Sequence, residues 1–281
     1  MSSNSPGSHE DGPGAGEGGP GRLILEEPAP GVARLVISNP GKRGALDQAI
    51  LDAFAGMLPQ LDARCLIITG EGTTFSSGYD IGDLDGPGSR RFADEAENLV
   101  AHPYTAALAA IESYPYPTVA ALNGHAIGGG LEIALSCDLR IAVGTITLGM
   151  PPARLGLVYS HTGIRKFIDT IGAPRTRELF LTARRIDGRT ARAWGLVNEL
   201  SEAGRLADDA LKLAVKIAGH APLAQTGNKR VIGAVLAARG QMDPDVEREL
   251  VELRRACFAS EDFREAVEAF AQKRPPDWQG R

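Results

Sequence analysis

Glu132 is the best candidate for acid–base chemistry, because it closely follows the three consecutive glycines Gly128, Gly129 and Gly130. The apolar run 118–122 before the glycines predicts a buried strand, and an apolar helix is expected after them. Glycines between a strand and a helix let the backbone turn tightly and approach a ligand. The first N–H groups of a helix lack intrahelical partners, so they can stabilise an oxygen that gains negative charge. The stretch predicts oxyanion donors beside a carboxylate, although tight helix–strand packing with a surface glutamate explains it equally well.

Other residue types that perform chemistry lack the spacing that they need. Ser160 and His161 are adjacent, which says nothing about a nucleophile–base geometry, and no G-x-S-x-G elbow occurs. The glycine run does not match G-x-G-x-x-G, the pattern of dinucleotide sites. The 3 cysteines are far apart and lack metal-ligand spacing, so we expect structural thiols in a reducing cytoplasm.

Composition predicts a cytoplasmic globular protein with a disordered N-terminal tail. The chain has 281 residues, of which 43% are hydrophobic, and a formal net charge of −5. Residues 1–21 hold 7 Gly, 3 Pro and 4 Ser without Lys or Arg, a composition that cannot bury enough apolar area to fold. No apolar run is long enough to span a membrane, and the N-terminus lacks the features of a secretory signal. Without a basic block, nucleic-acid binding has no electrostatic support.

Hydrophobic patterning indicates an α/β core over residues 22–200 and a helical region over 201–281. Expected strands are 23–26, 32–37, 65–69, 118–122 and 139–143, and expected helices within this alternation are 50–61 and 92–114. From residue 161 onward the chain is predicted to be almost wholly helical, with helices at 161–171, 173–182, 187–194, 206–219, 223–240, 246–258 and 263–273. Loops that leave the strand ends are expected to build the site.

Five segments, taken in order and at their spacing, resemble the enoyl-CoA hydratase/isomerase (crotonase) superfamily from about residue 23 to the C-terminus. They are Asn39-Pro40…Arg43-Gly44-Ala45-Leu46, Thr69-Gly70…Phe75-Ser76-Ser77-Gly78-Tyr79-Asp80-Ile81, Asn123-Gly124…Gly128-Gly129-Gly130-Leu131-Glu132…Cys137-Asp138, Ala193-Trp194-Gly195-Leu196-Val197-Asn198, and Glu261-Asp262-Phe263…Phe270…Lys273-Arg274-Pro275. The resemblance implies a spiral of ββα units followed by helices that mediate trimerisation, hence a homotrimer or a dimer of trimers. It also implies an acyl-CoA substrate, with coenzyme A present only as the thioester part of that substrate and no other cofactor.

The same resemblance assigns roles to individual residues. Family members stabilise a thioester enolate with two backbone N–H groups, which by position are those of Tyr79 and Gly129, leaving the tyrosine side chain to line the acyl pocket. The candidate catalytic residues are Tyr79, Gly129, Glu132, Tyr159 and His161, and the candidate CoA-binding residues are Arg43, Ala45, Leu46, Ser77, Asp80, Ile81, Phe263 and Lys273. Phe263 and Lys273 match a pair that contributes from a neighbouring subunit. Without the resemblance, Phe263 is an ordinary helix-packing aromatic.

Pro152 is the main departure from the family pattern. Hydratases of the family use two glutamates; Glu132 matches the first, and Pro152 stands in the place of the second. Because proline can neither accept nor give a proton, the two-carboxylate hydration cannot operate here. The segments Met150-Pro151-Pro152 and Leu157–Ile164 resemble the methylmalonyl-CoA decarboxylase branch, in which a tyrosine at the position of Tyr159 lies near the acyl group. Decarboxylation needs no base, only stabilisation of the enolate that CO₂ leaves behind.

The sequence therefore predicts an acyl-CoA lyase that decarboxylates a small malonyl-type CoA ester. Tyr159 and His161 lie beside the presumed acyl pocket and either could protonate the enolate, as could Glu132. Alternatively, Tyr159 packs with its hydroxyl satisfied and His161 caps a helix start. The competing functions are an enoyl-CoA hydratase using Glu132 with Tyr159 or His161, a C–C or thioester hydrolase, and a non-catalytic acyl-CoA-binding paralogue.

Overall fold

The computed structural model describes residues 19–79, 100–238 and 242–280. Its main sheet has six strands in the order β1-β2-β4-β7-β9-β12, in which β1 and β2 are antiparallel and the other neighbours are parallel. These strands are β1 (Arg22–Ala29), β2 (Val32–Ser38), β4 (Cys65–Gly70), β7 (Thr118–Leu122), β9 (Leu139–Val143) and β12 (Glu199–Ser201). Every residue of β7 is buried, which explains why the central parallel strands appear in the sequence as continuous apolar runs.

Two smaller sheets lie beside the main one. One has the order β11-β10-β8-β5 and the other pairs β3 with β6. Their strands are β3 (Ala45–Leu46), β5 (Thr74–Ser76), β6 (Gly78–Tyr79), β8 (His125–Ile127), β10 (Thr147–Gly149) and β11 (Arg185–Asp187). Along the chain, a strand of the main sheet is followed by a strand of the four-stranded sheet and then by a helical segment, as in β7, β8 and α4 (Gly129–Ser136). This repeated ββα arrangement confirms the predicted fold class.

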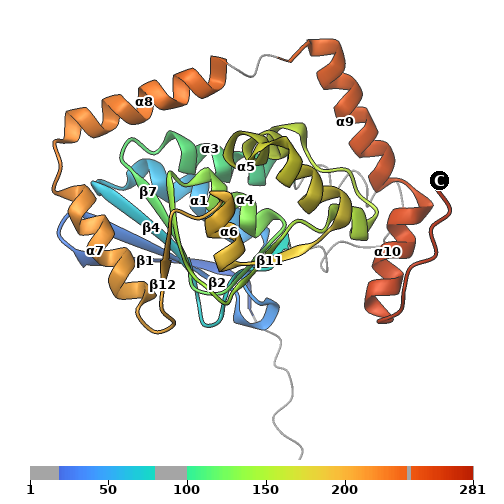
Figure 1. Ribbon diagram of the computed structural model, residues 1–281, viewed down its shortest axis with the longest axis horizontal. Coiled ribbons are helices and arrows are strands. Elements are labelled where there is room, and N and C mark those ends of the chain that lie inside the picture. Colours follow the sequence, from blue (N-terminus) through green and yellow to red (C-terminus); the bar gives the residue numbers. More distant parts are fainter. Residues whose placement is uncertain (1–18, 80–99, 239–241, 281) are drawn as a thin grey trace, which may run out of the picture.

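Helices surround the sheets and form most of the C-terminal part (Figure 1). In the first half of the chain they are η1 (Pro40–Lys42), α1 (Gln48–Met57), η2 (Leu58–Gln60), the π-helical turn η3 (Val100–Tyr104) and α3 (Thr105–Ser113). After α4 they are η4 (Pro152–Leu155), α5 (His161–Thr182), α6 (Gly188–Trp194), α7 (Leu206–Ala218), α8 (Pro222–Ala238), α9 (Pro244–Phe258) and α10 (Glu261–Ala271). No helix among the described residues is both long and apolar enough to cross a membrane.

One expectation about the elements needs correction, and another is confirmed. The region after residue 161 is not almost wholly helical, because β11 and β12 interrupt it and β12 completes one edge of the main sheet. Each is only three residues long and partly exposed, so neither produces an apolar alternation in the sequence. The break expected between the helices 161–171 and 173–182 is confirmed, because α5 is kinked at Gly172, whose φ of 76° and ψ of 161° are not helical.

Two other expectations fall largely outside the described residues. They are the tail over 1–21, of which only residues 19–21 are described, and the first part of the helix expected over 92–114. From Val100 the described chain is helical as far as Ser113, although its first turn is a π-helix that contains Pro103.

The C-terminal helices are placed differently with respect to the sheet. Helix α7 packs on β4, β7 and β9, whereas α8 leads away to α9 and α10 at the opposite end of the molecule (Figure 1). Helix α10 packs against η4 and α9, so the last two helices border the segment that contains Pro152. The C-terminal helices thereby contribute to the candidate site.

Candidate active site

The start of α4 packs directly against β6. Gly128 has φ 54° and ψ −124°, a conformation in which residues with a side chain are strained. A Cβ on Gly130 would lie 2.6 Å from both Cβ and the backbone oxygen of Ser76, so only glycine permits this approach. A Cβ on Gly78 would lie 3.3 Å from the backbone nitrogen of Gly129. The predicted oxyanion donors, the N–H groups of Tyr79 and Gly129, therefore belong to two segments in contact.

The two loops expected to hold coenzyme A lie side by side. Strand β3 pairs in parallel with β6, matching Ala45 with Gly78 and Leu46 with Tyr79. Ser77 donates from its backbone N–H to the carbonyl of Arg43 at 3.2 Å. Arg43 has φ 54° and an exposed side chain, whereas Ala45 and Leu46 are buried. Asp80 and Ile81, also predicted to bind coenzyme A, lie outside the described residues.

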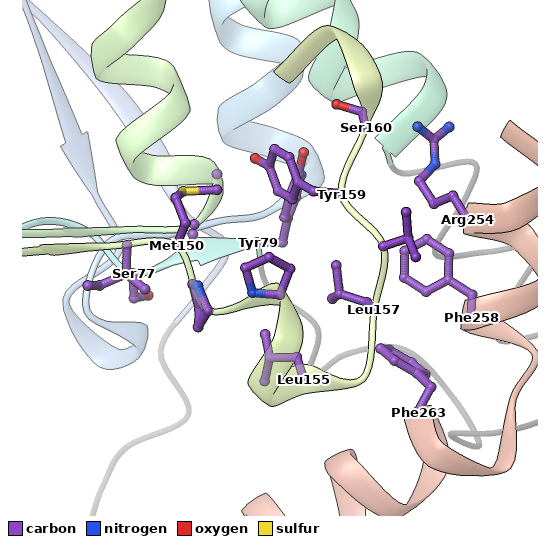
Figure 2. Close-up of a pocket in the computed structure, with 17 residues that line it drawn as sticks. Ser77, Tyr79, Met150, Leu155, Leu157, Tyr159, Ser160, Arg254, Phe258 and Phe263 are labelled. Carbon is purple, nitrogen blue, oxygen red and sulfur yellow. The ribbon is translucent and has the colours of Figure 1, made fainter. Parts of the chain in front are cut away.

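A mainly apolar cavity opens beside the start of α4 (Figure 2). It encloses about 820 Å³ of empty space, including its opening to solvent. Its lining consists of Ser77, Gly78, Tyr79, Ile127, Gly128, Gly129, Met150, Pro151, Pro152, Leu155, Leu157, Val158, Tyr159, Ser160, Arg254, Phe258 and Phe263. Among the described residues that line the cavity, none carries a carboxylate.

Glu132 lies behind the wall of this cavity rather than in it. Its side chain is 1% exposed, and its Oε2 accepts hydrogen bonds from the hydroxyls of Tyr159 at 2.5 Å and Tyr104 at 3.0 Å. The ammonium of Lys166 lies 3.5 Å from Oε1, and it also pairs with Glu112 at 2.5 Å. The carboxylate is thus covered on its pocket side by tyrosines and compensated on the other by a lysine.

Tyr79, Tyr104 and Tyr159 surround this carboxylate. The rings of Tyr79 and Tyr104 meet edge to face, with centroids 4.4 Å apart. Burial, and then the charge of Glu132, raises the pKa of all three hydroxyls well above the usual range of tyrosine. All three therefore remain protonated at neutral pH, and the single hydroxyl proton of Tyr159 is directed at Glu132.

Pro152 and His161 differ in their relation to the cavity. Pro152 is buried, begins η4 and lines the cavity. His161 does not line it; its Nε2 lies 3.4 Å from Oε1 of Glu247 on α9, and its buried Nδ1 has no hydrogen-bond partner. The cap of α5 is Ser160, whose hydroxyl accepts a hydrogen bond from the N–H of Gly163 at 3.0 Å, so the capping role considered for His161 is wrong.

The C-terminal residues of the site come from α9 and α10 of the same chain. Phe263 is 1% exposed, lines the cavity and meets Phe258 edge to face at 5.3 Å between centroids. Lys273 follows α10 and is exposed. Phe263 thus reaches the cavity of its own chain, a position that the resemblance assigned to a neighbouring subunit.

Sequence reasoning missed Tyr104, Lys166, Arg254 and Phe258. Arg254 and Phe258 are one helical turn apart and are the buried residues of α9. The spacing of Arg254 and Phe258 was the only sequence signal for any of these four residues. Tyr104 and Lys166 belong to helices that no local sequence pattern connects with Glu132.

A spiral of ββα units whose glycine-rich helix start borders an apolar cavity is the crotonase class of fold. The family described as Enoyl-CoA hydratase/isomerase matches residues 27–281, and the chain belongs to this family, the crotonase superfamily.

The chain is similar to members with different activities. A probable enoyl-CoA hydratase of Bacillus subtilis is 32% identical over 256 residues, which cover 89% of this chain and 95% of the relative. The methylmalonyl-CoA decarboxylase of Escherichia coli is 31% identical over 244 residues, covering 85% and 91%. A solved structure of methylmalonyl-CoA decarboxylase in complex with 2-nitronate-propionyl-CoA is 29% identical, with a TM-score of 0.82 and coverage of 92% of this chain and 98% of that one.

Proposed function

We propose that the protein decarboxylates a small malonyl-type CoA thioester and stabilises the resulting enolate with the N–H groups of Tyr79 and Gly129. The observation that carries this proposal is the absence of a carboxylate from the described cavity lining, where Glu132 is covered by tyrosines and Pro152 replaces the second glutamate. Hydration requires groups that take and give protons at the substrate, whereas decarboxylation requires only an oxyanion site and a proton donor.

The reaction breaks the bond between the α-carbon and the carboxylate carbon. Its electron pair passes onto the thioester oxygen, CO₂ leaves as a neutral molecule, and the two N–H groups stabilise the new negative charge. Loss of one such donor typically slows a reaction by about 10²–10³-fold. The Tyr159 hydroxyl then turns its proton from Glu132 to the cavity and gives it to the α-carbon, and the product is the acyl-CoA shortened by one carbon. Solvent restores the proton on Tyr159.

Tyr159 is a better proton donor for this step than the other two candidates. It lines the cavity, while His161 is directed at Glu247 and Glu132 lies behind the tyrosine. A tyrosinate formed next to Glu132 is costly, so Tyr159 is a weak acid. The transfer is driven by the much greater basicity of the enolate carbon, and solvent then reprotonates Tyr159.

Enoyl-CoA hydration is the second candidate function. It is favoured by the retained Glu132, whose 2.5 Å hydrogen bond to Tyr159 links a carboxylate to a hydroxyl at the cavity wall. Such a pair could exchange protons with a water molecule in the cavity if the Tyr159 side chain moved away from Glu132. The chain is also similar to relatives named as hydratases, including the 2,3-dehydroadipyl-CoA hydratase of Escherichia coli at 29% identity, and this similarity supports hydration as the second candidate.

A single set of assays distinguishes these functions. We expect purified protein to release CO₂ from methylmalonyl-CoA or ethylmalonyl-CoA and not to hydrate crotonyl-CoA. Hydration without CO₂ release would reject decarboxylation, and binding of CoA esters without turnover would indicate the non-catalytic paralogue. A Glu132→Gln variant with full decarboxylation would remove Glu132 from the chemistry.

We also propose that the protein assembles as a homotrimer or a dimer of trimers. Helix α8 has no buried residue in the single chain and exposes large apolar side chains, with Leu223 87%, Val231 61% and Ile232 60% exposed. Exposed apolar side chains clustered on one element are typical of subunit interfaces. Light scattering after size-exclusion chromatography measures the state directly. The cytoplasmic location, expected from the cysteines, stays a prediction.

A further inference from the structure

Arg254 is a buried cation at the wall of the candidate acyl cavity. Its side chain, on α9, is 8% exposed and lines the same cavity as Tyr79, Gly129 and Tyr159. Figure 2 shows Arg254 and Phe258 extending from α9 towards the loop that carries Tyr159. Within the described part of the chain, Arg254 is the one formally charged side chain in the cavity lining.

The local charge balance makes this cavity suited to an anion. Among the described residues, the carboxylate of Glu132 is covered by Tyr104 and Tyr159, and Lys166, which also pairs with Glu112, lies 3.5 Å from it. Burial is the main reason for the raised pKa of Tyr79, whereas the positive charge of Arg254 lowers this pKa. Arg254 is therefore close enough to interact electrostatically with the tyrosine cluster. A guanidinium at the wall of a mainly apolar cavity interacts strongly with a carboxylate that enters it, because little water screens the pair.

We propose that Arg254 binds the carboxylate of the acyl group, so that the cavity selects CoA thioesters with a carboxylated acyl group over neutral acyl-CoA. The inference rests on the proposed function for the position of the thioester. It does not require Arg254 to lack a protein partner, since a guanidinium has five N–H donors and can serve two acceptors.

The way in which α9 is attached explains how Arg254 is held in place. Glu247 on α9 lies 3.4 Å from Nε2 of His161, and the thiol of Cys257 contacts the carbonyl of Gly156 at 2.9 Å. These contacts lie on either side of Arg254 along the helix and fix α9 to the start of α5 and to the end of η4. The guanidinium is thus presented by a docked helix, which limits the conformational entropy that it loses on binding.

An ion pair with the departing carboxylate has a distinctive kinetic consequence. Before cleavage the negative charge is on the carboxylate; during cleavage it moves to the thioester oxygen, and CO₂ leaves uncharged. The pair with Arg254 is therefore stronger in the bound substrate than in the transition state, so it contributes to binding and not to kcat. We expect Arg254→Leu to raise KM for methylmalonyl-CoA at least tenfold without lowering kcat.

Binding of unreactive ligands tests the proposal independently of catalysis. S-(2-carboxypropyl)-CoA and S-isobutyl-CoA are thioethers of the same shape that differ in a carboxylate against a methyl group, and neither has a thioester to react. By isothermal titration calorimetry, we expect wild type to prefer the carboxylated ligand at least tenfold. Arg254→Leu should abolish the preference with unchanged affinity for S-isobutyl-CoA. The matched control Arg255→Leu, which removes an exposed arginine next to it, should keep the preference.

The outcomes separate this inference from the proposed function. Equal affinity of wild type for the two thioethers, or an unchanged preference in Arg254→Leu, would overturn the carboxylate site without reference to catalysis. Arg254→Lys keeps a positive charge and much of the stem, so it should retain part of the preference; complete loss in a folded Arg254→Lys protein would count against a charge effect. A preference without CO₂ release would reject decarboxylation and keep the site.

Discussion

The hydroxyl of Tyr159 donates a 2.5 Å hydrogen bond to Oε2 of Glu132, and only the tyrosine of this pair lines the cavity. The carboxylate that the family resemblance predicts for acid–base chemistry therefore lies against a tyrosine. Tyr104 donates to the same oxygen at 3.0 Å, which further covers the carboxylate. The group at the cavity wall is therefore a neutral hydroxyl and not a carboxylate.

Tyr159→Phe should lower kcat for formation of the decarboxylated product by about 10²–10⁴-fold, the usual contribution of a positioned acid. KM should change little, because the ring and its edge-to-face contact with Phe180, 5.6 Å between centroids, remain. Steady-state kinetics with methylmalonyl-CoA measure both constants. Tyr116→Phe, which removes a hydroxyl outside the cavity lining, is the control. A kcat within twofold of wild type for Tyr159→Phe would assign protonation to another group.

Lys166→Met should destabilise the protein because it leaves the buried carboxylate of Glu132 without its cation, which lies 3.5 Å away. Removal of one partner of a buried pair typically costs about 3–5 kcal/mol, more than the pair itself contributes. Urea denaturation measures this loss. The double variant Glu132→Gln/Lys166→Met should recover part of it, since the uncompensated charge is gone. Strictly additive losses would show that the two side chains are not coupled.

The sequence was sufficient for the parts of the fold and site that depend on local patterns. The apolar run of β7 and the three glycines before Glu132 predicted a buried strand followed by a tight helix start. The positive φ of Gly128 and the close approach of Gly130 to Ser76 explain why glycine occupies these two positions. The departure at Pro152 was also visible, because it concerns one residue type in a recognisable segment.

The direction in which the Glu132 side chain points could not be predicted from the sequence. It depends on Tyr104, 28 positions earlier, and on Lys166, in helices brought together only by the fold. Arg254 was missed for another reason: an arginine in an amphipathic helix is usually exposed, and only the packing of α9 against η4 and α5 buries it. Strands as short as β11 and β12 give too few residues for a periodic pattern.

Gly130→Ala should destabilise the protein by about 1–3 kcal/mol, the usual cost of overpacking, because its Cβ would lie 2.6 Å from both Cβ and the backbone oxygen of Ser76. The gain in helix propensity, about 1 kcal/mol, does not offset this. Gly56→Ala is the matched control, since Gly56 is an exposed helical glycine on which a Cβ would have no atom within 4 Å, and the change should stabilise by about 0.5–1 kcal/mol. Thermal and urea unfolding measure both variants. Equal effects would mean that α4 moves away from β5, which contains Ser76, without cost.

The tyrosine cluster predicts a loss of stability at alkaline pH. Burial and the charge of Glu132 raise the pKa of Tyr79, Tyr104 and Tyr159 in the folded state above the value in the unfolded chain. Above about pH 10 the unfolded chain releases these protons and the folded protein retains them, so their contribution is complete below that pH and declines above it. The free energy of unfolding should fall by about 1.4 kcal/mol per pH unit for each such tyrosine.

Urea denaturation between pH 8 and about 11 measures this decline, and absorbance at about 295 nm follows tyrosinate formation in the folded protein. Above about pH 10, the free energy of unfolding of Tyr159→Phe should fall less steeply than that of wild type, by the contribution of one tyrosine. Other groups that titrate in this range contribute equally to both proteins and cancel in the difference. Because the folded cluster stays protonated, tyrosinate absorbance from these three residues should appear only on unfolding. Parallel stability curves for wild type and Tyr159→Phe would mean that Tyr159 ionises as readily in the folded protein as in the unfolded chain.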